Sequence, residues 1–284
     1  MVNKYIPTSK QEALDILSKH DCYIFAGGSD LMVVKKNVAG SLPKFDKDVC
    51  YISHIDELKG IYKDLEGVHI KSLTTLDEVE HSPLIPNLLR KAVSEVASTN
   101  IRHFATLVGN IANASPAGDT IVVDVILDAV LKLESADGVR FVKAEDFVQG
   151  VRKIDRRPNE LITEIIFPEL DYNGEMWFKV GSRKADSISK VMVAGIYKIS
   201  EQSIKKFSLV FGSVSIKPVR SRKIEESLEG ISLIDLKNRK EEIVEEYSKL
   251  IKPIDDQRST AEYRLTVAKN IIRKFIDQVV GGNN

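Results

Sequence analysis

The sequence has few of the groups that many metal and redox sites need. Only two cysteines occur in 284 residues, Cys22 and Cys50. Two thiols exclude a disulfide framework and are too few for a four-cysteine zinc or iron–sulfur site within this chain. We expect both to be small buried apolar residues. The five histidines show no metal-ligand spacing, and we expect most of them at the surface: His20, His54, His69, His81 and His103.

Several sequence motifs are also absent. No two glycines have the G-x-G spacing, so the Rossmann fingerprint is missing. The patterns G-x-x-x-x-G-K-[ST], H-E-x-x-H and G-x-S-x-G do not occur either. These absences argue against an ordinary hydrolase, a P-loop NTPase or a zinc enzyme. We identify no catalytic residue and no metal site from the sequence.

The sequence has neither an excess of one charge sign nor a long apolar run. Lys plus Arg number 41 and Asp plus Glu number 41, so there is no basic excess to bind nucleic acid or an anionic membrane. No segment approaches 18 uninterrupted apolar residues, and the first twenty residues lack the apolar core of a signal peptide. We therefore expect a cytoplasmic protein with no membrane span and no nucleic-acid partner.

The length suggests about two domains, and the turn formers in FPELDYNGE place a boundary near Pro168–Gly174. Upstream, we expect a first helix capped by Thr8 or Ser9 with Gln11 completing a capping box, a short strand Tyr23–Phe25, and a helix over 84–97. A hairpin is predicted in VLKLESADGVRFV, with its turn at Asp137-Gly138.

Downstream, MWFKVGSRK, VMVAGIYKIS and FSLVFGSVSI indicate three strands with tight connections. Two helices are predicted at 221–228 and 241–251, followed by a closing helix with a capping box at Ser259 and Glu262. Because strands and helices occur in runs, the pattern favours an α+β fold over a doubly wound sheet.

Two segments stand out for chemistry. FAGGSDLM, at positions 25–32, has Gly27-Gly28 directly after an apolar strand. This pair is either a tight turn or a loop of bare N–H groups that a phosphate can approach. The second segment, TNIRHFATLVGNIANASPAGDT at 99–120, is rich in small residues and carries Asn110 and Asn113. Small side chains let a flat ligand approach the backbone, and amides offer donors and acceptors.

The second segment also contains a helix-start pattern. Ser115 suits the N-cap, Pro116 the first helical position, and Asp119 lies in the first turn. A helix N-terminus presents free N–H groups to a polar or anionic ligand. Alternatively, Asp119 only stabilises the helix dipole.

FAGGSDL and ATLVGNIANASPAGD resemble the two flavin-binding segments of the FAD-binding (medium) subunit of the xanthine dehydrogenase and carbon monoxide dehydrogenase family, the molybdenum hydroxylases. The resemblance extends over nearly the whole chain. It includes TTLDEVEHSPLI, STNIRHFAT, ELITEIIFP, WFKVGSRKADSISKV, KPVRSRKIEESLEG and DDQRSTAEYRL. It implies a two-lobed FAD-binding domain at 1–170 and a small α+β domain with a three-stranded sheet at 175–280, of the carbon monoxide dehydrogenase flavoprotein type.

Carried over by position, the resemblance assigns residues to FAD. Backbone amides of the first loop would hold the pyrophosphate: Phe25, Ala26, Gly27, Gly28, Ser29, Asp30, Leu31 and Met32. The second loop would lie against the flavin: Thr106, Leu107, Val108, Gly109 and Asn110. Asp119 would bind hydroxyls of the ribityl and ribose region, and Ile162 and Lys179 would lie near the isoalloxazine ring. Lys179 would then stabilise negative charge on a reduced flavin; without the resemblance it is a strand-surface lysine.

Val108 departs from the family pattern. The family has T-I-G-G-N or close to it, whereas this chain has TLVGN. A β-branched residue is costly at positive φ, and its Cβ crowds a ligand. Either the loop has a negative φ at Val108, or FAD binds weakly or differently.

The resemblance also implies a function. A substrate is hydroxylated at a molybdenum cofactor on one partner subunit, and electrons pass through iron–sulfur clusters on another. The FAD of this chain passes them to NAD or another acceptor. Two alternatives stay open: a stand-alone flavin reductase, and a non-enzymatic relative that has lost FAD, for which Val108 is the main support.

Overall fold

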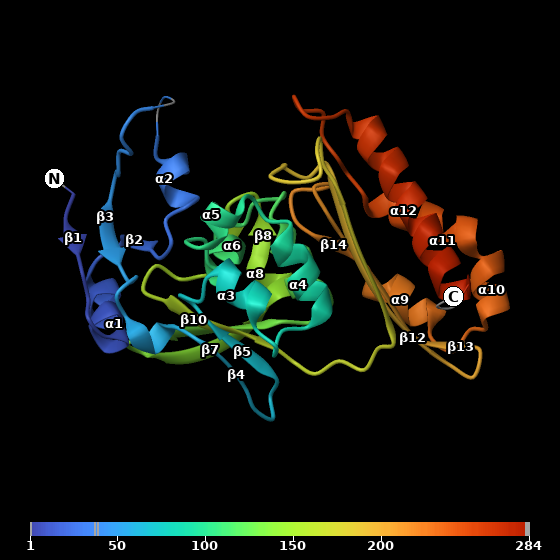
Figure 1. The fold of residues 1–284 in the computed structure, drawn as a ribbon, viewed down its shortest axis with the longest axis horizontal. Helices are drawn as coiled ribbons and strands as arrows, with labels where there is room; N and C mark the ends of the chain where they lie inside the picture. Colours follow the sequence, from blue (N-terminus) through green and yellow to red (C-terminus); the bar gives the residue numbers. More distant parts are fainter. Residues whose placement is uncertain (1, 37, 39, 282–284) are drawn as a thin grey trace. The chain divides into compact units, whose positions relative to one another are not determined.

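The computed structural model describes residues 2–36, 38 and 40–281, and it divides into two compact units (Figure 1). Unit 1 comprises Met1–Pro86, Ala97–Ala114 and Asp128–Glu169. Unit 2 comprises Asn87–Val96, Ser115–Leu127 and Leu170–Asn284. Helices and strands occur in runs, which confirms the predicted α+β class. The predicted sequence domains, 1–170 and 175–280, are contiguous, whereas the units interleave; the domain ranges stay a prediction.

The first sheet of unit 1 is parallel. Its strand order is β1 (Lys4–Tyr5), β3 (Asp48–Tyr51), β2 (Cys22–Phe25). The helix α1 (Lys10–Lys19) packs into the same core through Ala13, Leu14 and Leu17. Cys22 and Cys50 are free and fully buried in that core, as predicted.

Ser9 caps α1, because its side chain accepts a hydrogen bond from the Glu12 N–H at 3.1 Å. The predicted pairing of Thr8 with Gln11 is wrong. Glu12 reaches back instead, and its Oε2 accepts from the Thr8 N–H at 2.7 Å.

The second sheet of unit 1 is antiparallel and has the order β4-β5-β10-β6-β7. Its strands are β4 (Ile61–Lys63), β5 (Val68–Lys71), β10 (Leu161–Phe167), β6 (Val130–Ser135) and β7 (Gly138–Lys143). The predicted hairpin is present, but its turn lies one residue earlier than expected. Ser135 pairs with Gly138, so Ala136 and Asp137 form the turn, and Gly138 with φ 142° begins β7.

Short elements complete unit 1: α2 (Leu31–Val34), η1 (Asp56–Leu58), α3 (Leu76–His81), α5 (Thr99–Arg102), α6 (Leu107–Asn113), α8 (Ala144–Phe147), β8 (Val148–Gly150) and β9 (Lys153–Ile154). Four of the five histidines are exposed, as predicted for most of them. The exception is His69 on β5, which is buried. Its Nε2 lies 2.9 Å from Asp64 Oδ1 and its Nδ1 3.2 Å from Glu164 Oε2. Among the described residues, no group of His, Cys, Asp and Glu has a metal-binding arrangement.

Unit 2 is built on an antiparallel sheet of order β11-β12-β13-β14. The strands are β11 (Gly174–Val180), β12 (Val191–Ser200), β13 (Ser203–Gly212) and β14 (Val219–Arg220). Three were predicted; the two-residue β14 was missed. A tight turn joins β12 to β13 through Glu201 and Gln202, at φ 52° and 59°. The predicted tight connection between β11 and β12 is wrong, because residues 181–190 form a longer loop.

Helices pack on both faces of this sheet. A Cβ atom added to Gly195 would lie 2.5 Å from the Phe275 ring of α12. A Cβ atom added to Gly212 would lie 2.6 Å from Val122 of α7. In Figure 1 the long helix α12 runs beside α11, next to β12 and β13. The helices of unit 2 are α4 (Asn87–Ser94), α7 (Asp119–Ile126), α9 (Arg222–Leu228), α10 (Leu233–Asn238), α11 (Lys240–Leu250) and α12 (Ala261–Gly281).

Three helix predictions need correction. The first helix of this group, α4, is shorter than the predicted 84–97, and α10 was not predicted. At the start of α12, Thr260 rather than Ser259 accepts the capping hydrogen bond, from the Tyr263 N–H at 3.2 Å. Across the described residues, every helix is too short or too polar to cross a membrane.

Candidate functional site

The glycine segment lines a cavity of about 330 Å³ in unit 1. The chain leaves β2 at Phe25 and enters α2 at Leu31, so the intervening backbone is irregular and its N–H groups are not committed to a sheet. From the predicted first loop, the residues that line the cavity are Ala26, Gly27, Gly28, Ser29, Asp30 and Leu31. Phe25 and Met32, at the ends of that loop, do not line it.

Both glycines are required by the surrounding protein. A Cβ on Gly27 would lie 1.7 Å from the carbonyl oxygen of Phe104. Gly28 has φ +72°, and a Cβ there would lie 2.2 Å from Cζ of Phe25. The missing side chains therefore allow close packing of the loop itself. This result shows a tight turn whose other side borders a cavity, so the two sequence interpretations do not exclude each other.

The predicted second loop is the start of a helix. Thr106 is the N-cap of α6, and its Oγ1 accepts from the Gly109 N–H at 3.0 Å. Thr106, Gly109 and Asn110 line the same cavity as the glycine segment, and so does Asn113. Leu107 is fully buried and does not line the cavity.

Val108 lies within α6 and is not among the residues with positive φ. Its backbone is helical, so the first alternative for TLVGN, a negative φ at Val108, is the one that the structure has. The side chain is 5% exposed, and Val108 lines a cavity of about 200 Å³ rather than the 330 Å³ cavity. A β-branched residue is therefore accommodated here without backbone strain.

Two cations line the cavity with the glycine segment. Lys35 is already engaged, because its Nζ lies 2.6 Å from Asp46 Oδ1. Arg152 has no ion-pair partner among the described residues, although its charge acts on Asp30. Desolvation raises the pKa of Asp30, and the nearby Arg152 guanidinium lowers it in part. Arg152 has φ 55°, and its N–H donates to the Ala114 carbonyl at 3.0 Å.

A second cavity of about 200 Å³ adjoins the first, and four residues line both: Ile24, Ala26, Gly109 and Ala112. Its remaining wall is mostly apolar and includes Ile162, one of the predicted site residues. Two polar side chains also line it, Ser72 and Arg156. The Ser72 hydroxyl is buried and has no hydrogen-bond partner among the residues that the structure describes.

Sequence reasoning missed Arg152, Arg156 and Ser72. Each is a single common residue outside any motif, and only the folded chain places it against the glycine segment or α6. The one available signal was the spacing of Arg152 after Gly150, which marks a turn but not a site.

The predicted residues Asp119 and Lys179 belong to unit 2 and contact each other. Lys179 Nζ donates to Asp119 Oδ2 at 2.8 Å and to the Glu95 carbonyl at 2.6 Å. The Ser189 hydroxyl donates to Asp119 Oδ1 at 2.5 Å. Burial raises the pKa of Asp119, and Lys179 and Ser189 oppose that shift. Their predicted contacts with flavin stay predictions.

The predicted N-cap at Ser115 is wrong. The helix α7 begins at Asp119, with Gly118 as the N-cap residue. Ser115 instead forms a turn, because its carbonyl accepts from the Gly118 N–H at 2.9 Å. The Pro116 carbonyl accepts from the Ser213 N–H at 2.9 Å, which holds this turn against β13. Asp119 does lie in the first turn of the helix, as predicted.

The residues of unit 1 fit a dinucleotide. Irregular backbone beside Gly27 suits a diphosphate, and so does the cation Arg152, which has no ion-pair partner in the described part of the chain. The adjoining apolar cavity suits an aromatic ring, and its orphaned Ser72 hydroxyl needs a polar partner.

Two family models match the chain. The FAD binding domain in molybdopterin dehydrogenase matches residues 1–170, and the CO dehydrogenase flavoprotein C-terminal domain matches residues 176–279. Together they confirm the predicted FAD-binding domain.

Relatives and solved structures agree. The chain is 32% identical to the glyceraldehyde dehydrogenase medium chain of Sulfolobus acidocaldarius, over 95% of each chain. It is 30% identical to the nicotinate dehydrogenase FAD-subunit of Eubacterium barkeri, over 81% of this chain and 80% of that one. The structure matches a chain of the Cu,Mo-CO dehydrogenase in its cyanide-inactivated form with a TM-score of 0.87 and 25% identity, covering 99% of this chain and 98% of that one. The chain therefore belongs to the FAD-binding subunits of the molybdenum hydroxylases, a family of oxidoreductases.

Proposed function

We propose that this chain binds one FAD non-covalently in the adjoining cavities of unit 1 and transfers electrons within a multi-subunit dehydrogenase. The observation that carries the proposal is the 330 Å³ cavity between Ala26–Leu31 and the start of α6, in a chain of this family. Bound FAD supplies two-electron chemistry that can also proceed in single-electron steps. The residues of the chain bind and orient it.

The backbone of Gly27 to Asp30 would donate to the diphosphate, and Arg152 would add a positive charge. Thr106, Gly109 and Asn110 form the facing wall. No His or Cys lines the cavity, so the wall offers no side chain of the kinds that form covalent flavin links. Asp119 and Lys179 belong to unit 2, and their roles toward flavin stay predictions from the resemblance.

The electrons would come from a partner subunit. Cys22 and Cys50 are the only cysteines, and both are fully buried in the core of unit 1. A cysteine-ligated cluster therefore cannot form on this chain. We propose that an iron–sulfur subunit delivers the electrons, that a molybdenum-cofactor subunit oxidises the substrate, and that NAD or another acceptor receives the electrons from this chain.

Two measurements test the proposal. The purified chain should show the visible absorption of an oxidised flavin, and acid or heat denaturation should release all of it as FAD into the supernatant. Colour that stays with the precipitate would contradict non-covalent binding. Purification of the native complex should recover this chain with two other polypeptides, iron and molybdenum. A lone chain that oxidises an aldehyde, a purine or carbon monoxide would contradict the role as a subunit.

The alternative of a relative that has lost FAD has little left to support it. Val108 was its main argument, and Val108 lies in a helix with its side chain buried. A colourless protein that does not take up FAD on reconstitution would still establish that alternative.

A further inference from the structure

One cation at the wall of the cofactor cavities, Arg156, lies on an irregular segment of the chain, residues 151–160. The segment contains only the two-residue strand β9 before β10 begins at Leu161. We propose that Arg140, which lines neither cavity, is a positioning residue for FAD: it holds this segment in place and acts through Arg156. This inference rests on the proposed function, because it takes FAD as the ligand of unit 1.

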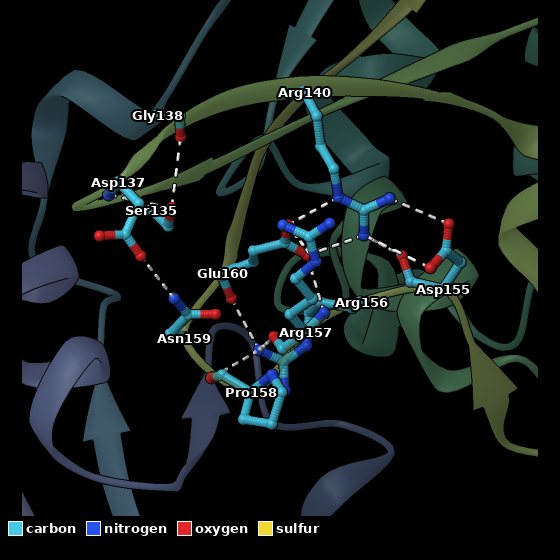
Figure 2. Close-up of polar contacts among 10 residues, drawn as sticks. All are labelled: Ser135, Asp137, Gly138, Arg140, Asp155, Arg156, Arg157, Pro158, Asn159 and Glu160. Carbon is cyan, nitrogen blue, oxygen red and sulfur yellow. Dashed lines mark hydrogen bonds and ion pairs between the residues drawn. The ribbon is translucent and has the colours of Figure 1, made fainter.

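Arg140 binds two acidic residues of the segment (Figure 2). Its Nε donates to Glu160 Oε1 at 2.6 Å, and its Nη2 donates to Glu160 Oε2 at 2.8 Å. Its Nη1 donates to Asp155 Oδ2 at 2.9 Å, and its Nη2 also donates to the Asp155 carbonyl at 2.8 Å. A planar guanidinium with several donors fixes direction as well as distance, which a point charge does not. These contacts form the Arg140 clamp, which holds the segment at both Asp155 and Glu160.

Arg140 is itself anchored in a sheet. It lies on β7 and pairs with Leu133 of β6, whose side chain is 1% exposed in the core. The segment that it holds also has backbone contacts of its own: β9 pairs with β8, and the Asp155 N–H donates to the Phe147 carbonyl at 2.8 Å. These backbone contacts should keep the segment folded without Arg140, whereas the Arg140 clamp sets where the stretch from Asp155 to Glu160 lies.

The Arg140 clamp holds the residues on both sides of Arg156. Asp155 precedes Arg156 in the chain, and the Glu160 carbonyl accepts from Arg156 Nη1 at 2.7 Å. The same Nη1 donates to the carbonyls of Arg157 and Pro158, at 3.1 and 3.3 Å. Among the described residues, Nε and Nη2 of Arg156 make no hydrogen bond, so these groups remain available to a ligand. A shift of Asp155 or Glu160 would therefore move the Arg156 guanidinium at the cavity wall.

Arg140 also neutralises a carboxylate whose charge acts on Arg156. Burial lowers the pKa of the Arg156 guanidinium, and the negative charges of Asp21 and Glu160 oppose that shift. Burial would raise the pKa of Glu160, but hydrogen bonds from Arg140 and from the Arg157 N–H outweigh it, so the net shift is downward. Without Arg140, the buried Glu160 carboxylate would keep only Arg157 as an ion-pair partner among the described residues, with Nε 3.9 Å away. It would then compete with the ligand for Arg156.

Arg140→Met removes the Arg140 clamp and keeps most of the aliphatic stem. In the flavin-free full-length chain, its dissociation constant for FAD should rise by about tenfold or more, because Arg156 loses its fixed position. Calorimetric titration with FAD measures it. Arg140→Lys keeps the charge but not the planar group, so its dissociation constant should rise less, by about threefold. If Arg140→Met does not fold, Arg140→Lys and Glu160→Gln, which removes the bound carboxylate, provide the same test.

A double-mutant cycle separates positioning from general destabilisation. Arg156→Met alone should weaken FAD binding by about tenfold. If Arg140 acts through Arg156, adding Arg140→Met to that variant should weaken FAD by less than about twofold further. A merely structural role of Arg140 would instead weaken FAD by the same factor in both backgrounds.

Arg273→Met is the matched control. Arg273 on α12 also binds a glutamate at two points, because its Nε lies 2.8 Å from Glu241 Oε1 and its Nη2 lies 2.7 Å from Glu241 Oε2. The side chain is 35% exposed, against 25% for Arg140, and Arg273 lines neither cavity. Arg273→Met therefore removes a comparable ion pair in unit 2, and FAD binding should stay unchanged.

Three results would overturn the role of Arg140. The first is a wild-type chain that binds FAD together with an Arg140→Met chain of equal affinity. The second is a pair of losses that multiply in the double-mutant cycle, which would mean that Arg140 does not act through Arg156. The third is an equal loss of FAD binding in Arg273→Met. All three leave the proposed function intact, whereas a wild-type chain that does not bind FAD would overturn the proposed function itself.

Discussion

The candidate site residues of unit 1 and unit 2 differ in whether their polar groups have partners within the protein. In unit 2, Lys179 and Asp119 bind each other, and Ser189 and the Glu95 carbonyl complete the set. In unit 1, the Ser72 hydroxyl has no partner, and Arg152 and Arg156 have no carboxylate within ion-pair distance among the described residues. Both sets are polar, but the sequence pointed only to Asp119 and Lys179. The comparison separates groups that stabilise the fold from groups that are available to a ligand.

Asp119→Ala tests the satisfied side of the comparison and should have the largest effect. The side chains of Asp119 and Lys179 are 8% and 6% exposed, so the substitution leaves a buried lysine without its carboxylate. We expect the free energy of unfolding of the flavin-free protein to fall by about 3–5 kcal/mol. Chemical denaturation without flavin measures it.

The control for Asp119→Ala is Asp171→Ala, which breaks an ion pair with Lys198 at an exposed site. It should cost less than about 1 kcal/mol. An Asp119→Ala protein that keeps its flavin-free stability but loses affinity for FAD would show the reverse: Asp119 would then be a ligand contact, as the family resemblance implies.

Asp124 is a third kind of polar group: it is buried, no cation among the described residues pairs with it, and it lines neither cavity. It is fully buried on α7, and burial raises its pKa well above the usual value, with Thr120 opposing the shift. Its folded state therefore holds a proton that the unfolded chain loses above about pH 4. Because the folded state binds more protons, stability must fall as pH rises, by at most about 1.4 kcal/mol per pH unit.

Asp124→Asn should remove this dependence. Between about pH 5 and about pH 8, the wild type should lose stability relative to the variant, and the loss should continue until the pH passes the raised pKa. Urea denaturation at several pH values measures the difference. The control Asp171→Asn changes an exposed carboxylate, and its stability relative to the wild type should not rise with pH in this way. Parallel wild-type and Asp124→Asn curves would mean that Asp124 is ionised in the folded protein.

Gly27→Ala tests whether the glycine segment is built for packing. The new Cβ would lie 1.7 Å from a backbone oxygen, which cannot move as a flexible side chain can. We expect a loss of about 1–3 kcal/mol in the flavin-free protein and a further loss of FAD binding, because the loop must shift. Thermal melts with and without FAD measure both. Gly281→Ala, where a Cβ meets nothing within 4 Å, is the control and should be neutral.

Gly28 differs from what the sequence alone leads one to expect. From FAGGSDLM alone, a side chain at position 28 would block the approach of a phosphate. In the structure, a Cβ on Gly28 would instead meet the Phe25 ring. Loss of FAD in Gly28→Val would therefore not distinguish blocked ligand from a disturbed loop, and substitutions at cavity side chains are the sharper tests.

Much of the fold was predictable because its signals are local. The apolar runs VMVAGIYKIS and FSLVFGSVSI indicated β12 and β13, and both strands are present. The failures have tertiary causes. Ser115 does not cap α7, because the hydrogen bond from the Ser213 N–H to Pro116 holds that segment in a turn. The helix α10 was missed because its six residues carry too few apolar positions to show a period.

The site shows the same division. Gly27, Gly28 and Asn110 belong to contiguous segments, so sequence reasoning found them. Arg156 and Ser72 lie 84 positions apart in the sequence and meet only at the cavity wall. Their roles depend on what their neighbours leave unsatisfied, such as the carboxylates bound by Arg140. No spacing rule carries that information.

Arg152→Gln tests the unsatisfied side of the comparison with the smallest expected effect. Arg152 lines the cavity beside the glycine segment and has no ion-pair partner within the described ranges, so its loss should leave flavin-free stability unchanged. Gln would adopt the same φ of 55° as Arg152. FAD affinity should fall by about tenfold, and its decrease with added salt should become shallower, because a charge that faces a diphosphate is screened. Calorimetric titration with FAD at low and high salt measures both effects, and Arg157→Gln should show neither. A destabilised Arg152→Gln protein with unchanged affinity would place Arg152 with the fold-stabilising groups of unit 2, and the contrast between the two units would fail.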